Sequence, residues 1–224
     1  MSGWLETYRG IVYRWEVDHN DHLTVAFYFA RLGDAADGLL NALGLGLEYA
    51  RRRGGLCLTT DCYVRYQREL RVGDIMHITS GVLGVERDGL VLGHKVFNSE
   101  TGEVCTTVEE RLRHVDARRR TARALTPAQR RAAEQRRVDW DGPPRERRPR
   151  PAGLEGFRDS GRETVKPDEI DVFGQVALMH YIHRFSAANG HVTAAFGITP
   201  GYMRAERRGF STFEFQLEVG GGLR

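Results

Sequence analysis

The sequence contains the same local pattern twice, and this repetition limits the architectures that it can form. Residues 18–45 and 171–198 align without a gap at a constant offset of 153 positions. Several apolar positions match between the two copies, and several residues are identical. The identical pairs include Asp18/Asp171, Tyr28/Tyr181, Arg31/Arg184, Ala35/Ala188 and Gly44/Gly197. A repeat of this length predicts two similar folding units that arose by duplication, rather than a solenoid.

The first unit is predicted to span residues 1–116 and to combine one helix with several strands. Residues 8–17 are rich in aromatic and β-branched residues, which favours a strand. Apolar residues then recur at three- and four-residue steps from Val25 to Leu43, as in a helix that packs on one side. Further strands are expected at residues 56–66, 75–86, 90–98 and 104–115. This order favours an α+β unit in which an antiparallel sheet wraps the helix.

Two glycines bear on the predicted helix. Gly44 is placed to end it, because glycine readily adopts the left-handed conformation that follows many helices. Gly33 lies inside it, where glycine costs about 1 kcal/mol relative to alanine. We interpret Gly33 as a point of close approach between the helix and the sheet.

The stretch from 117 to 156 is rich in arginine and proline and is predicted to be a solvated linker. Thr126 and Pro127 start a short helix in it, which is expected to be exposed because it has almost no apolar face. The second unit then covers residues 157–224, with a strand at 159–166, a helix at 178–196 and a strand at 210–219. By the repeat offset, about 45 residues of C-terminal strand are missing from this copy, so it is expected to be incomplete.

The composition is that of an ordinary globular protein, with 41% hydrophobic and 28% charged residues. A net charge of +3 is too small to indicate nucleic-acid binding. No apolar run reaches the length of a membrane span, and the N-terminus has no apolar signal core. Cys57, Cys62 and Cys105 lack a metal-binding spacing, and their odd number favours a reducing compartment. We therefore expect a cytoplasmic protein without a metal, a cofactor, or a nucleic-acid or membrane partner.

The turn before the first predicted helix carries a recognisable motif. Residues 18–24 read DHNDHLT, which resembles the Asp-x-x-Gly-His-Val/Met-Asn motif of hot-dog acyl-CoA thioesterases, with Tyr28 following as in that family. Asp21 stands at the family's Gly and Thr24 at its Asn. Residues 33–37 and 66–74 are most similar to double hot-dog proteins related to betainyl-CoA thioesterases. The resemblance implies a double hot-dog fold, here with an incomplete second copy, and the hydrolysis of an acyl-CoA thioester.

Hydrolysis of a thioester requires a nucleophile or base and donors for the carbonyl oxygen. The helix start offers donors, because its first N–H groups lack partners within the helix. The N–H groups near Thr24, Val25 and Ala26 are our candidates. Asp18 is placed to attack the thioester or to activate water, and His22 to orient the carbonyl group or Asp18. The Thr24 side chain either shares that task or only caps the helix, and capping is an alternative for Asp18 too.

Other residues have less defined roles. Tyr28 and Tyr66 are expected to bind substrate. For the carboxylates, a solvated surface position competes with a role as base, and the residues concerned are Asp34, Asp37, Glu109 and Glu110. His180 and His183 lie three positions apart, but a metal site would need further ligands. An aromatic cage for a betaine-like cation would draw on Tyr13, Trp15, Tyr63 and Tyr66.

The second copy of the motif has changed. Gln175 stands at the position of His22, and Ala177 at that of Thr24, so catalysis is assigned to the first copy. A non-hydrolytic acyl-thioester-binding or assembly module on the same fold is the alternative function, because a fold does not determine a function. The expected partners are the acyl-CoA substrate and, within the chain, the other copy in a pseudo-dimer. Association into homo-oligomers is left open.

Overall fold

The computed structural model describes residues 3–18 and 20–220. The chain divides into two compact units. The first runs from the N-terminus to Pro143 and also includes the strand segment that begins at Phe213. The second runs from Pro144 to Thr212. Residues 117–143 of the expected linker are therefore part of the first compact unit.

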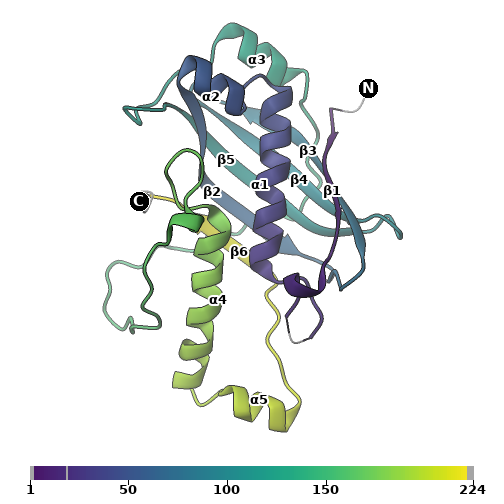
Figure 1. The fold of residues 1–224 in the computed structure, drawn as a ribbon, viewed down its shortest axis with the longest axis vertical. Helices are drawn as coiled ribbons and strands as arrows, with labels where there is room; N and C mark the ends of the chain where they lie inside the picture. Colours follow the sequence, from purple (N-terminus) through teal and green to yellow (C-terminus); the bar gives the residue numbers. More distant parts are fainter. Residues whose placement is uncertain (1–2, 19, 221–224) are drawn as a thin grey trace. The chain divides into compact units, whose positions relative to one another are not determined.

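The first unit is built on a six-stranded sheet in the order β1-β3-β4-β5-β2-β6, in which all neighbouring strands are antiparallel. Helix α1, Val25–Ala42, lies across one face of this sheet (Figure 1). The expected α+β arrangement of a helix wrapped by an antiparallel sheet is confirmed. The strands are β1 Leu5–Ile11, β2 Gly55–Tyr66, β3 Ile75–Val85, β4 Gly89–Asn98, β5 Val104–Asp116 and β6 Glu214–Glu218.

The core forms where the apolar side of α1 meets the sheet. Leu39, Leu40 and Leu43 pack there with leucines and valines of β3, β4 and β5. Gly33 plays no part in this contact, because it is exposed and a Cβ atom on it would meet nothing within 4 Å. The close approach is instead at Gly38, where an added Cβ would lie 3.0 Å from the carbonyl oxygen of Thr7. Our interpretation of Gly33 was therefore wrong.

The first strand also differs from the prediction. β1 ends at Ile11, and residues Arg14–Glu16 form a short 3-10 helix, η1, where the alternating pattern predicted continued strand. The carboxylate of Glu16 accepts the backbone N–H of Tyr13 at 2.9 Å and pairs with Arg31 of α1. Beyond Ile11 the chain thus leaves the sheet, and Glu16 forms a buried ion pair with the helix. An alternating pattern of residues along the chain cannot reveal such a pair.

Helix α3, Pro127–Glu134, begins where Thr126 and Pro127 predicted it, and Thr126 accepts the backbone N–H of Gln129. It is not an exposed linker helix. Ala133 is fully buried in the core cluster with Leu125. Its buried residues are Gln129 and the small Ala133, so the sequence lacked the large apolar residues that indicate packing.

The second unit contains η2 (Pro167–Glu169), α4 (Leu178–Ala195) and α5 (Pro200–Glu206). The strand predicted at 159–166 is not formed, and only η2 precedes the helix. The bounds of η2 and α4 equal those of η1 and α1 shifted by the repeat offset. Those of α5 stand in the same relation to α2, Leu47–Arg53. The bounds of these three helical elements therefore follow the same offset as the sequence match.

Among the described residues, no helix is both long and apolar enough to span a lipid bilayer. The same residues contain no group of three or more His, Cys, Asp or Glu side chains that could hold a metal ion.

Candidate active site at the start of helix α1

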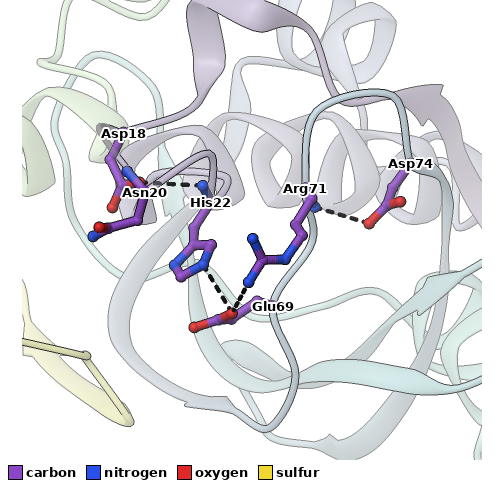
Figure 2. Close-up of polar contacts among 6 residues, drawn as sticks. All are labelled: Asp18, Asn20, His22, Glu69, Arg71 and Asp74. Atoms are coloured by element: carbon purple, nitrogen blue, oxygen red, sulfur yellow. Dashed lines mark hydrogen bonds and ion pairs between the residues drawn. The ribbon is translucent and has the colours of Figure 1, made fainter.

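The turn that leads into α1 is organised by Asp18. Its Oδ1 atom accepts the backbone N–H groups of Asn20 at 2.8 Å and of His22 at 3.1 Å (Figure 2). Asp21 has a positive φ of 62°, which is the left-handed region that glycine favours and that aspartate tolerates better than most residues. The structure thus accounts for an Asp at the family's Gly position. Asp18 holds the backbone of the turn through one of its two carboxylate oxygens.

His22 is paired with a carboxylate from a different part of the chain. Its Nε2 atom lies 2.9 Å from Oε2 of Glu69, which also accepts the Arg71 guanidinium at 3.0 Å (Figure 2). The backbones are joined as well, because Leu23 donates its N–H to the carbonyl oxygen of Leu70 at 2.8 Å. The backbone N–H of Arg71 in turn donates to Asp74 at 2.8 Å. The imidazole is therefore held in one orientation by a carboxylate that is itself held.

Thr24 precedes α1, but its side chain does not cap the helix. Its hydroxyl oxygen is buried and has no hydrogen-bond partner among the described residues. The first N–H groups of α1, at Val25 and Ala26, lack partners within the helix and lie at the positive end of its dipole. The start of α1 therefore offers backbone N–H groups and an unused hydroxyl at one place.

The helix start is fixed to η1 by two contacts of Glu16. Its backbone oxygen accepts the N–H of Thr24 at 2.9 Å, and its buried carboxylate pairs with Arg31, the seventh residue of α1. The same contacts recur in the second unit. There Glu169 accepts the N–H of Ala177 at 3.0 Å and pairs with Arg184 at 2.5 Å.

Tyr28 and Tyr66 pack against each other below the start of α1, with ring centroids 5.2 Å apart in an edge-on arrangement. Burial raises the pKa of both phenols, that of Tyr66 well above its ordinary value, so both remain protonated donors at neutral pH. The Tyr66 hydroxyl is buried without a hydrogen-bond partner among the described residues. It is the second unused hydroxyl near the helix start.

The remaining candidate carboxylates lie apart from this cluster. Asp34 and Asp37 are exposed on α1. Glu109 and Glu110 are neighbours on β5. Glu110 is buried and Glu109 is half-buried, because successive side chains of a strand point to opposite faces of the sheet. Glu110 accepts the Thr59 hydroxyl at 2.5 Å and lies 3.3 Å from Nε2 of His94.

The four aromatic residues considered for a cation cage do not surround one space. Tyr13 and Trp15 stack on each other with centroids 4.4 Å apart. Tyr63 and Tyr66 are three residues apart on β2 with no bulge between them, so they face opposite sides of the sheet. His180 and His183 lie on α4 with ring centroids 6.4 Å apart, and burial lowers the pKa of His183.

Sequence reasoning missed two residues of the site. Glu69 lies in the segment 66–74 that carried part of the resemblance, but nothing in that segment indicated its contact with His22. Glu16 could have been found, because the repeat offset aligns it with Glu169 just as it aligns Arg31 with Arg184. A repeated Glu and a repeated Arg indicate an ion pair that both copies use.

This fold and this helix start are those of a thioesterase-like protein. A model of the thioesterase-like superfamily matches residues 12–141, and the chain belongs to that superfamily. The matched region contains α1, the turn before it and β2 to β5, so it covers the whole candidate site.

Curated relatives narrow the resemblance to one group. The chain is 35% identical over 127 residues to an Agrobacterium fabrum protein named L-carnitine dehydrogenase/betainyl-CoA thioesterase, covering 57% of this chain and 26% of that one. It is 30% identical over 115 residues to a Pseudomonas aeruginosa betainyl-CoA thioesterase, covering 51% of this chain and 72% of that one. The chain thus spans about a quarter of the bifunctional relative and most of the shorter one.

Solved structures support the fold alone, because their sequence identities are low. An acyl-ACP thioesterase from Bacteroides thetaiotaomicron has a TM-score of 0.76 at 14% identity, covering 99% of this chain and 82% of that one. The 12:0-ACP thioesterase of Umbellularia californica has a TM-score of 0.72 at 15% identity, covering 99% and 78%. Together with the sheet topology, these similarities identify an α+β hot-dog fold.

Proposed function

We propose that the protein hydrolyses an acyl-CoA thioester to a free acid and CoA at the start of α1. The observation that carries this proposal is the His22–Glu69 pair beside the first N–H groups of the helix. A held imidazole is a general base, and unpartnered N–H groups stabilise a developing oxyanion. The names of the curated relatives support the same reaction class.

The geometry supports one sequence of steps. Nε2–H of His22 donates to Glu69, which leaves Nδ1 free to take a proton from water. The water oxygen attacks the thioester carbon, and the carbonyl oxygen becomes an oxyanion beside the N–H groups of Val25 and Ala26 and the Thr24 hydroxyl. The carbon–sulfur bond then breaks, and the departing CoA thiolate takes the proton back from His22.

Asp18 has a second role in this proposal. Its Oδ1 atom shapes the turn that presents His22 and the helix start, while Oδ2 remains available as an alternative base or nucleophile. Tyr28 and Tyr66 are proposed to contact the thioester end of the substrate, where the protonated Tyr66 hydroxyl can donate a hydrogen bond. The exposed Asp34 and Asp37 and the distant Glu110 are left out of the chemistry.

We also propose that the chain is a double hot-dog protein made by duplication. The matching bounds of α1 and α4 support this, as do the matching Glu–Arg pairs. A third support is the pairing of β2 with β6, in which Tyr63 stands opposite Gln216. The repeat offset also aligns Tyr63 of β2 with Gln216 of β6. Two equivalent residues therefore stand opposite each other in this antiparallel pair, as a two-fold axis between the two strands requires. An experimental structure in which α1 and α4 were not related by a local two-fold axis would contradict this.

The second copy is proposed to keep the turn but not the chemistry. Asp171 accepts the N–H groups of Phe173 at 2.8 Å and Gln175 at 3.0 Å, as Asp18 does in the first copy. Gln175 and Ala177 replace the imidazole and the hydroxyl. The position equivalent to Glu69 is Gly222 in the sequence, which lies outside the described residues.

The direct test is a screen of acyl-CoA thioesters with detection of the free CoA thiol. Betainyl-CoA is tried first because of the relatives' names, followed by short, branched and aromatic acyl groups. Release of CoA thiol by the wild type and its loss in His22→Gln would support the proposal. A wild type that binds these thioesters without releasing thiol would replace it with the non-hydrolytic alternative.

A further inference from the structure

The surface beside the candidate site carries an exposed pair of stacked aromatic rings. Tyr13 and Trp15 of the η1 region stack with centroids 4.4 Å apart and an angle of 7° between the ring planes. Trp15 exposes 71% of its surface and Tyr13 exposes 43%. Large aromatic residues are usually buried or at interfaces, so a stack left open to solvent calls for an explanation.

The pair is not required by the local backbone. The second unit forms the same 3-10 turn, with the same Glu–Arg pair and the same link from the helix start, but it has Lys166 and Asp168 at the two aromatic positions. The aromatic residues therefore occur only in the copy that has His22 and Thr24. Their distribution follows the chemistry of the site rather than the stability of the turn.

The pair is also firmly placed at the rim of the site. Trp15 is two residues from Val17, so the two Cα atoms are at most roughly 7 Å apart. Val17 forms a bridge with Leu23, the neighbour of His22. The N–H of Tyr13 and the N–H of Thr24 both bind Glu16, which fixes the orientation of the turn relative to α1.

We propose that the open face of Trp15 stacks against the adenine ring of CoA, with Tyr13 supporting it from behind. A planar heterocycle extends an existing aromatic stack, and such stacking does not require hydrogen bonds to the base. The nearby guanidinium groups of Arg14 and Arg71, with side chains 71% and 57% exposed, suit the phosphates at the same end of CoA. This inference rests on the proposed use of acyl-CoA. It adds that the nucleotide end of CoA binds beside the candidate active site, at the η1 turn.

The test measures binding by calorimetry, with three probes that divide the CoA molecule. CoA and adenosine 3′,5′-bisphosphate both contain the adenine ring, whereas pantetheine does not. Trp15→Ala should weaken the binding of the first two by between about 5-fold and 100-fold and leave pantetheine unchanged. Trp15→Phe keeps a ring and should lie close to the wild type. Phe157→Ala removes an aromatic residue that is 62% exposed in the second unit and serves as the matched control, with no expected effect.

The outcomes separate this inference from the proposed function. If Trp15→Ala binds CoA and the bisphosphate within two-fold of the wild type, the adenine site is overturned, whether or not thioesters are hydrolysed. If the variant loses nucleotide affinity but no thioester is cleaved by the wild type, the adenine site stands and the hydrolytic function fails. Equal losses with pantetheine would mean that Trp15 shapes the site as a whole, which also overturns the inference.

Discussion

Nε2 of His22 and Oε2 of Glu69 lie 2.9 Å apart, although one residue precedes α1 and the other follows β2. The pair brings the proposed base and its proposed orienting group together only in the folded chain. Glu69 is 47% exposed through its side chain and is also held by Arg71, so its contribution lies in orientation more than in burial.

We predict that His22→Gln lowers the rate of thioester hydrolysis by at least 100-fold, because glutamine cannot act as a general base. Gln175→Ala, at the equivalent position of the second copy, is the matched control and should change the rate less than three-fold. Rates are measured by release of CoA thiol. Equal damage from both variants would contradict the assignment of catalysis to the first copy.

Glu69→Gln should lower turnover by about 10-fold while leaving substrate affinity nearly unchanged, because the amide orients the imidazole less strongly than a carboxylate does. Glu100→Gln, on an exposed turn, serves as the control. Turnover in Glu69→Gln equal to that of the wild type would show that Glu69 does not act through His22.

For Asp18, two substitutions separate the turn from the chemistry. Asp18→Asn keeps an oxygen that can accept the N–H groups of Asn20 and His22, whereas Asp18→Ala removes it. Asp18→Ala should cost about 1 kcal/mol of unfolding free energy, as loss of a cap does, and Asp18→Asn less. Turnover and thermal stability are measured together. If Asp18→Asn is stable but loses turnover by orders of magnitude, the carboxylate itself takes part in the reaction.

The two helix glycines should respond in opposite directions. Gly33→Ala is expected to stabilise the protein by about 0.5–1 kcal/mol, because the position is open to solvent and alanine favours the helix. Gly38→Ala should be neutral or destabilising, since its Cβ would press on the carbonyl oxygen of Thr7 at 3.0 Å. Chemical denaturation of both variants gives the comparison. A destabilised Gly33→Ala protein would mean that this face of α1 is covered in solution.

The ion pair that ties η1 to α1 should be costly to break. Arg31→Met leaves the buried Glu16 carboxylate without its partner and is expected to cost about 3 kcal/mol of unfolding free energy. Arg52→Met removes half of an exposed pair with Glu48 and should cost less than about 0.5 kcal/mol. Denaturant unfolding measures both effects through the shift in midpoint, provided that the slope of unfolding free energy against denaturant concentration is the same in the variants and the wild type. Similar small losses in the two variants would contradict a structural role for the Glu16–Arg31 pair.

The stability of the fold should fall in mild acid because of His114. This residue is fully buried, lies between the Tyr49 hydroxyl at 2.9 Å and the Arg123 carbonyl oxygen at 2.8 Å, and burial lowers its pKa. The unfolded chain therefore binds a proton more readily than the folded one, so the free energy of unfolding decreases as pH falls below about 6.5. Unfolding curves measured between pH 5 and 8 give the free energy of unfolding at each pH. This free energy should depend less steeply on pH in His114→Asn than in the wild type.

Local patterns in the sequence were enough to locate the helix, the turn before it and the repeat. Apolar spacing placed α1 within one residue of its end, and the helix predicted at 178–196 likewise ends one residue beyond α4. The motif also predicted His22 and Thr24 as candidate site residues. These features depend on neighbours along the chain, so a one-dimensional pattern contains the information that determines them.

The contacts that give the site its shape depend on folding in three dimensions. Glu69 reaches His22 only because Leu23 and Leu70 join their backbones, and Glu16 leaves the strand pattern because it pairs with Arg31 on the helix. The burial of α3 likewise depends on Ala133, which packs in a core formed by residues elsewhere in the chain. Such pairings join residues far apart in sequence, and their energies depend on distance and burial, which only the packed structure defines.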